Sequence, residues 1–193
     1  MDLQKLSARP RWAYYSSTPF RGLDVLLEAW PIVRSAVKDA ELHIFSSMKV
    51  YNETETVDYQ KLYDVAKNME GVHYHDSVGQ SQLRLTAQTC RILAYPCTFP
   101  ETSCITALEA MAAGCVVAGT DLGALPETAW HNPLVPMGDG WIKKWIFEVV
   151  RLLMDDAHYI SLAKQNITTA SYYAWSSVAV RWLQQFQLDF CRV

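Results

Sequence analysis

Short apolar segments alternate with longer segments of helical spacing along most of this chain, and this alternation limits the possible fold more than any other feature. Segments with the length and composition of strands occupy residues 11–15, 41–45, 71–75, 92–95 and 115–118, and a short sixth one lies near 134–135. Strands that alternate with helices pair in parallel, because each helix returns the chain to the same end of the sheet. We therefore expect an α/β fold with a Rossmann-like, doubly wound, mostly parallel sheet and helices on both faces.

Helices are expected between these strands and throughout the C-terminal part of the chain. The apolar spacing predicts them over residues 22–37, 59–69 and 80–88, after Glu101, and over 141–154, about 157–170 and 176–190. A chain of 193 residues is long enough for one substantial core. We expect a single domain over residues 1–193, with the helices of about 141–190 packed on it.

Composition excludes several classes of protein. The net charge of −3 provides no general basic surface, which argues against a nucleic-acid partner. The longest apolar runs are much shorter than the ~20 residues of a transmembrane helix, and the N-terminal residues lack the apolar segment of a signal peptide. The five cysteines are odd in number and lie mostly in apolar runs, which indicates buried free thiols and a cytoplasmic location. Neither Cys-x-x-Cys nor His-x-x-x-His occurs, so no metal site is expected.

Residues 98–114 place two carboxylates eight positions apart. Pro100 disfavours helix just before Glu101, Thr102 or Ser103 can cap a helix, and Glu109 would lie ~9 Å further along its axis. The helix start between the two carboxylates offers free N–H groups and a positive dipole end, which suit an anion. Carboxylates accept hydrogen bonds from hydroxyl groups, so this arrangement suits a ligand composed of a sugar, a diphosphate and a ribose.

At these residues the chain resembles a known family. Glu101 and Glu109 resemble the Glu-seven-residues-Glu motif of the retaining group 1 glycosyltransferases with the GT-B fold. Residues 16–30 resemble the phosphate-binding loop of that family and the helix after it, and residues 119–127 resemble the loop after its fifth strand. All three motifs follow predicted strands at their carboxyl ends, where open α/β sheets bind ligands. The resemblance is to the C-terminal, donor-binding half of the fold.

The resemblance implies roles for particular residues. Arg21 would contact the nucleotide diphosphate, where the family usually has Lys, and its position at a helix start, where the dipole disfavours a cation, also points to function. Glu101 would contact the donor sugar, so Arg21 and Glu101 are the catalytic candidates, and Glu109 would bind the ribose hydroxyls. The remaining donor-binding candidates are Gly22, Ser16, Ser17, Thr102, Ser103, Cys104 and Ile105, together with His75 and Ser77 near the nucleobase.

The implied function is retaining, metal-independent transfer of a sugar, of the hexosyltransferase type, from a nucleoside-diphosphate sugar to an unknown acceptor, without a cofactor. An N-terminal acceptor domain, or a partner chain in its place, would complete the enzyme, and the isolated chain would then be inactive. The alternative is a non-catalytic module that binds a nucleotide sugar. A sugar-nucleotide epimerase is a minor option, and a nicotinamide oxidoreductase is disfavoured because no Gly-x-Gly-x-x-Gly follows the first strand.

Some remaining patterns favour structural interpretations. His73 and His75 would share one face of the third strand, as packed or surface histidines rather than ligands. The glycosylation sequons at Asn52 and Asn166 are expected to stay unmodified without a signal peptide. Trp182, Phe186 and Phe190 recur every four residues on the last helix, which predicts a packing face or a partner surface.

Overall fold

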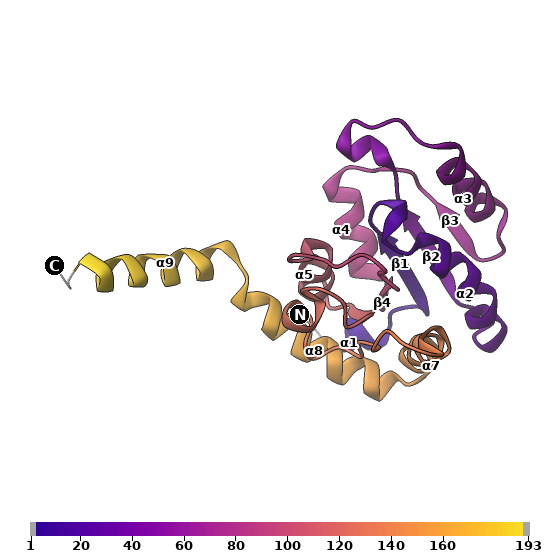
Figure 1. The fold of residues 1–193 in the computed structure, drawn as a ribbon. Helices are drawn as coiled ribbons and strands as arrows, with labels where there is room; N and C mark the ends of the chain where they lie inside the picture. The colour runs from indigo at the N-terminus through magenta and orange to yellow at the C-terminus, as the bar shows by residue number, and fades with distance from the viewer. Residues whose placement is uncertain (1–2, 191–193) are drawn as a thin grey trace.

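A sheet of five parallel strands forms the centre of the molecule in the computed structural model, which describes residues 3–190 (Figure 1). The strands are β1 (Trp12–Ser16), β2 (Glu41–Phe45), β3 (Val72–Tyr74), β4 (Ile92–Tyr95) and β5 (Val116–Gly119). Their order in the sheet is β3-β2-β1-β4-β5. The order reverses at the boundary between β1 and β4, which is where such sheets bind ligands. The predicted fold class is confirmed.

Helices cover both faces of the sheet. On one face α2 (Leu23–Ala36) packs against α3 (Val57–Asn68) and α7 (Trp141–Met154), and α4 (Gln80–Thr89) and α5 (Ile105–Ala112) lie on the other (Figure 1). Helix α8 (Asp156–Tyr172) packs against α5 and β5. The shorter elements and the last helix are α1 (Leu3–Ser7), the 3₁₀ turns η1 (Pro19–Arg21) and η2 (Met48–Tyr51), α6 (Leu125–Thr128) and α9 (Trp175–Phe190).

Buried polar contacts attach the C-terminal helices to β5. The fully buried Trp145 of α7 donates its indole N–H to the Ala118 carbonyl at 2.9 Å. Asn166 of α8 has no exposed surface; its amide donates to the Cys115 carbonyl at 2.8 Å and is hydrogen-bonded to the side chain of Asn132. Asn132 in turn accepts from the Val117 N–H at 2.7 Å. Each of these groups would be costly to bury without its partner, so they fix α7 and α8 on the sheet.

Two sequence-based expectations about individual elements are wrong. The short sixth strand near residues 134–135 is a single bridge between Thr120 and Val135. Neither Thr102 nor Ser103 caps α5, because the chain makes a further bend before the helix begins at Ile105, and Cys104 occupies the N-cap position in a left-handed conformation with φ of 57°. The remaining predicted elements differ from the observed ones by no more than two residues at either end.

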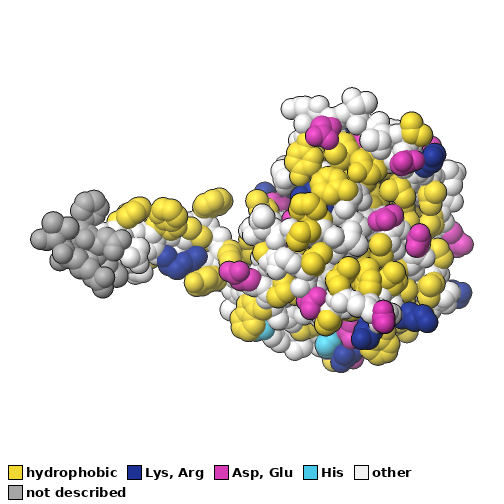
Figure 2. All heavy atoms as spheres, in the orientation of Figure 1, with side chains coloured by type: hydrophobic (Ala, Val, Ile, Leu, Met, Phe, Trp, Pro, Cys, Tyr) yellow, Lys and Arg dark blue, Asp and Glu magenta, His cyan; other side chains and the backbone are white. Residues whose placement is uncertain are grey.

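The last helix does not pack on the domain as expected. Helix α9 extends away from the sheet layers as an arm (Figure 1), and its apolar side chains lie on the surface of that arm (Figure 2). Trp182 is 62% exposed and Phe186 is 48% exposed, while the side chain of Phe190 lies outside the described residues. The two rings contact each other at 5.6 Å between centroids rather than the core. Only α7 and α8 of the three C-terminal helices therefore cover the sheet.

Four of the five cysteines are buried free thiols, as predicted: Cys90, Cys97, Cys104 and Cys115. Cys191 lies outside the described residues. Burial raises the pKa of Cys104 and of Cys115 to about 12, so both thiols stay protonated at neutral pH. Among residues 3–190, no helix combines the length and the apolar character that crossing a membrane requires.

Candidate functional site

A cavity of about 420 Å³ opens at the carboxyl ends of β1, β2, β3 and β4. Loops after these four strands and the start of α5 supply its lining, because parallel strands bring their carboxyl ends to one edge of the sheet. Most of the site residues predicted from the sequence line it: Ser16, Ser17, Arg21, Ser77, Glu101, Thr102, Ser103, Cys104 and Ile105. The sequence therefore locates the cavity through segments that are up to about ninety residues apart.

Arg21 and Glu101 form an ion pair at this cavity. The Arg21 Nε donates to Glu101 Oε1 at 2.8 Å, and the two side chains are only 15% and 10% exposed. The guanidinium carbon lies over the rings of Phe20 and Phe99, 4.6 and 5.0 Å from their centroids, in cation–π contacts. The two residues expected to be catalytic are thus in direct contact, which their positions in the sequence did not indicate.

The remaining contacts of Arg21 determine which of its donors stay available. Its Nη1 donates to the Thr18 hydroxyl and, at 3.3 Å, to the Tyr51 hydroxyl. Burial alone would lower the pKa of Arg21, but the hydrogen bond with Tyr51 and the Glu101 carboxylate raise it above its ordinary value. Within the described part of the chain, the contacts of Arg21 use Nε and Nη1, so the two N–H groups of Nη2 can donate to a ligand.

Glu101 is held by its side chain and by its backbone. Its Oε1 also accepts from the Tyr95 hydroxyl, and burial raises the pKa of that phenol far above its usual range, so Tyr95 remains a donor. The backbone carbonyl of Glu101 accepts from Ala124 N at 2.7 Å. Gly123 has a φ of +62°, and a Cβ there would lie 2.4 Å from Glu101 N. Only glycine allows this approach, so the segment after β5 supports the loop that carries Glu101.

The start of α5 faces the cavity without a capping side chain. Cys104 makes no side-chain cap, and Ile105 and Thr106 line the cavity at the first turn of the helix. The Thr106 hydroxyl donates to the Ser16 carbonyl at 3.0 Å and so ties this turn to the loop after β1. The first N–H groups of an α-helix have no partner within the helix and lie at its positive end. This turn can therefore bind an anionic group.

Glu109 lies in a second cavity, of about 290 Å³, over the face of the sheet that carries Tyr14. The distance along the axis from the start of α5 to Glu109 is shorter than predicted. The helix begins later, at Ile105, so this distance is ~6 Å rather than ~9 Å. The two cavities share four lining residues: Ser16, Gln80, Leu83 and Thr106. A ligand with its anionic centre at the start of α5 could therefore extend toward Glu109.

Gly22 and His75 line neither of these two cavities. Gly22 has a φ of +90°, and a Cβ there would lie 2.1 Å from the Pro96 carbonyl oxygen, so glycine lets the turn before α2 pack against the loop after β4. His75 stacks on Phe45 with ring centroids 4.7 Å apart, and Phe45 lines the first cavity. Gly22 therefore affects the packing of a loop, and His75 contacts a residue of the cavity lining without lining the cavity itself.

Sequence reasoning missed the aromatic residues at the site, among them Tyr51, Tyr95 and Phe99. Tyr95 and Phe99 lie at and just after the carboxyl end of β4, so their position at the predicted ligand edge was a usable signal. Tyr51 comes from η2 after β2, in a segment without a motif, and no local signal marked it.

The chain is a Rossmann-like α/β domain with a cavity at the carboxyl ends of its strands, and comparison with known proteins gives its family. Residues 10–155 match the family model described as Glycosyl transferases group 1. This match covers most of the chain, and the chain therefore belongs to the group 1 glycosyltransferases. Two of the three segments that resembled this family, residues 16–30 and 98–114, contribute to the lining of the cavity. The third, residues 119–127, contacts the backbone of Glu101.

One curated relative is the lipopolysaccharide 1,2-N-acetylglucosaminetransferase of Salmonella typhimurium. It is 27% identical over 179 residues, and the alignment covers 88% of this chain and 46% of the relative. The chain thus spans about half the length of this protein.

Solved structures agree on the fold. Sucrose-phosphate synthase from Thermosynechococcus elongatus superposes with a TM-score of 0.73 at 18% identity, over 97% of this chain and 47% of that one. HepE of Anabaena, in complex with UDP-glucose, superposes with a TM-score of 0.72 at 14% identity, over 100% of this chain and 54% of that one. The chain corresponds to one domain, the C-terminal half, of the GT-B fold.

Proposed function

We propose that this chain is the donor-binding domain of a retaining, metal-independent glycosyltransferase that uses a nucleoside-diphosphate sugar. The observation that carries the proposal is the Arg21–Glu101 pair beside the uncapped start of α5. The pair and the helix start put two positive centres and one carboxylate around a single cavity. The complex of HepE with UDP-glucose and the name of the Salmonella relative support a sugar nucleotide as the ligand class.

The chemistry follows from how these charges are held. In the transfer, the bond between the anomeric carbon and the diphosphate oxygen breaks, and the diphosphate leaves with the electron pair. The Nη2 donors of Arg21 and the N–H groups at the start of α5 would stabilise the charge that develops there. Glu101 accepts from Arg21 through Oε1 and so fixes the guanidinium plane, while its carboxylate is placed to accept from sugar hydroxyls. Arg21 and Glu101 hold each other in place, and groups fixed in this way need little reorganisation in the transition state.

The acceptor site is proposed to lie on a second domain or partner chain. This chain spans about half the length of its curated relative. Holding an acceptor against the anomeric carbon can supply ~7–11 kcal/mol of the barrier reduction. We expect the isolated chain to bind the donor and to transfer sugar only at background rate. A cytoplasmic location belongs to the same proposal, supported by the four buried free thiols.

The test is a binding titration with UDP-glucose, GDP-mannose and ADP-glucose, each beside its nucleoside, followed by a transfer and hydrolysis assay. We expect one sugar nucleotide to bind more tightly than its nucleoside, with no change in the presence of EDTA. Ligand at a hundred times its Kd should stabilise the fold by ~2.7 kcal/mol in a thermal shift. If none of the three binds better than its nucleoside, the donor-binding proposal is wrong.

The second candidate function is a non-catalytic module that binds a nucleotide sugar in the same cavity. Both candidates predict donor binding by the isolated chain. They differ when the chain is mixed with an acceptor-binding domain excised from the Salmonella relative. Transfer that needs both parts supports the enzyme, and binding without transfer in the mixture supports the module.

A further inference from the structure

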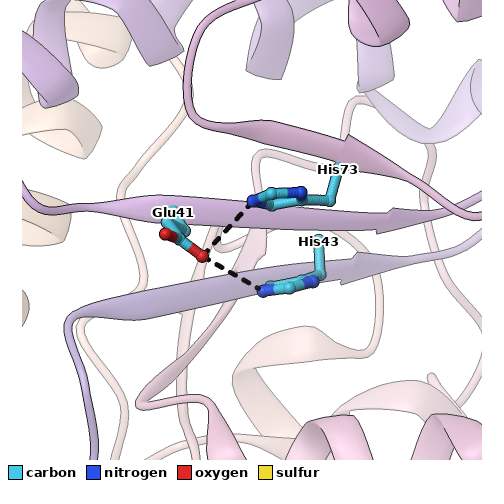
Figure 3. A group of neighbouring side chains, drawn as sticks. All are labelled: Glu41, His43 and His73. Carbon is cyan, nitrogen blue, oxygen red and sulfur yellow. Dashed lines mark ion pairs between the residues drawn. The ribbon is translucent and has the colours of Figure 1, made fainter.

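A cluster on β2 and β3 consists of Glu41, His43 and His73 (Figure 3). None of the three lines the first cavity, of about 420 Å³, which we call the donor cavity. Glu41 Oε2 lies 3.3 Å from His73 Nε2 and 3.9 Å from His43 Nε2. The two imidazole rings stack with centroids 4.9 Å apart, and both turn their Nε2 atoms toward the same carboxylate oxygen. Three donor atoms of the kinds that zinc prefers therefore converge on one point.

Strand geometry explains why these residues meet. Glu41 and His43 are two positions apart on β2, so their side chains leave the same face of the sheet. His43 is paired with His73 in the parallel register of β2 and β3, which places the second imidazole beside the first. Sequence reasoning looked for ligand spacing within one segment, and it missed a set that comes from two strands.

We propose that Glu41, His43 and His73 bind one Zn²⁺ ion. Zinc with ligands at ~2.0–2.1 Å in a tetrahedron separates each pair of donor atoms by about 3.3–3.4 Å. The Glu41–His73 distance already has this value, and the Glu41–His43 distance exceeds it by about half an ångström, which small side-chain rotations can supply. All the donor atoms lie within 4.8 Å of one another.

His43 is prepared to act as a ligand. Its Nε2 is buried and has no hydrogen-bond partner among the described residues, although a buried ring nitrogen normally has one. Its Nδ1 lies 3.1 Å from His75 Nε2; when Nδ1–H donates this hydrogen bond to His75, the Nε2 lone pair of His43 is free for a metal. Only neutral imidazole binds a metal.

Solvent reaches the cluster from the side of β3. The His73 side chain is 47% exposed and that of Glu41 is 35% exposed, which leaves an entry path and room for water as a fourth ligand. Strand β3 has only three residues and pairs with β2 alone. A bound ion would join this edge strand to β2, next to His75 and Phe45 at the rim of the donor cavity. The ion would thus link two strands of the sheet, and none of its three ligands lines the donor cavity.

The test is isothermal titration of the full chain with ZnCl₂ at pH 7.5, in a Cys191→Ser background so that this thiol does not compete. We expect one equivalent to bind and the thermal midpoint to rise. Removing a residue that only orients a metal ligand typically costs ~10–100-fold in metal affinity, so removing a direct ligand in His73→Gln or Glu41→Gln should cost at least about tenfold. The control His131→Gln removes a histidine outside the cluster and should change Zn²⁺ affinity less than about twofold.

His73 is half exposed and Glu41→Gln keeps the side-chain shape, so both variants should fold, which circular dichroism without zinc checks. A second readout follows the imidazole proton resonances, of which those of His43 and His73 should shift with Zn²⁺ while those of His131 stay unchanged. Absence of stoichiometric binding, or equal affinity in the wild type and His73→Gln, would overturn the proposal. Because His73 and Glu41 do not line the donor cavity, UDP-glucose binding tests the proposed function independently.

Discussion

Replacing Arg21 with Ala separates recognition of the diphosphate from recognition of the nucleoside. The Nη2 donors of Arg21 are available to a phosphate, while its Nε is already committed to Glu101. We therefore expect Arg21→Ala to weaken nucleoside-diphosphate binding and to leave nucleoside binding nearly unchanged. Arg21→Lys keeps the charge but not the fork of donors, so it should recover part of the affinity.

The magnitude follows from the hydrogen bonds that the substitution removes. A hydrogen bond to a charged group is worth ~1.5–3 kcal/mol, which corresponds to roughly ten- to more than a hundredfold in Kd. The substitution also leaves Glu101 without its cation. Breaking a fully buried ion pair costs about 3–5 kcal/mol of stability, but this pair borders an open cavity, with side chains 15% and 10% exposed, so we expect less. The chain should stay folded at room temperature, and circular dichroism can verify this.

The assay is a titration of wild type, Arg21→Ala and Arg21→Lys with UDP and with uridine, or with the diphosphate and nucleoside of whichever base binds. Lys61→Ala is the matched control, because it removes one positive charge from an exposed pair with Asp58 on α3. Equal losses for the diphosphate and the nucleoside would refute the assignment of Arg21. So would a loss of the same size in Lys61→Ala, which would indicate a general effect of net charge.

Three further predictions concern other parts of the molecule. Glu109→Gln should weaken binding of a ribonucleotide, whereas the affinity for a 2′,3′-dideoxy analogue should hardly change. If the wild type binds this analogue as tightly as the ribonucleotide, Glu109 does not bind the ribose. Iodoacetamide at pH 8 should label Cys104 and Cys115 slowly in the folded chain and rapidly in urea, because burial raises the pKa of each to about 12. Peptide mass spectrometry measures the labelling, and fast labelling of the native protein would argue against this burial. Trp182→Gln should reduce self-association of the isolated chain in analytical ultracentrifugation, since the ring of Trp182 is 62% exposed on α9. An unchanged sedimentation profile would show that α9 is not the surface through which copies of the chain associate.

The sheet could be predicted because each of its elements has a local signal. β2 and β4 were predicted at their observed bounds, since β4 is a short apolar run and β2 alternates polar and apolar residues before it ends at Phe45. The start of α5 could not be predicted, because Thr102 and Ser103 have good cap chemistry but the loop continues to Cys104. That conformation depends on contacts with distant segments, such as the Thr128 hydroxyl, which donates to the Ser103 carbonyl at 2.7 Å. Local propensity carries no information about such contacts.

The candidate site, like the fold, could be predicted only in part. Which residues line the cavity followed mainly from the family resemblance of segments at strand ends, where the edge of a parallel sheet brings them together. How they contact one another did not follow, since the Arg21–Glu101 pair joins residues eighty positions apart. The position of α9 could not be predicted for another reason. Its apolar spacing indicates a surface that contacts something, but the spacing is equally compatible with a core within the same chain and with a partner.

The buried position of Asn166 limits how this protein can be produced. Asn166 belongs to an Asn-Ile-Thr sequon, and in the folded chain its amide is hydrogen-bonded to the Cys115 carbonyl and to Asn132 with no surface exposed. Oligosaccharyl transfer in a eukaryotic secretory host acts on chains that have not yet folded, and a glycan added at this amide could not enter the interface between α8 and β5. Secreted expression should therefore yield misfolded, glycosylated material, and Thr168→Ala, which removes the sequon at an exposed position, should restore folding in such a host.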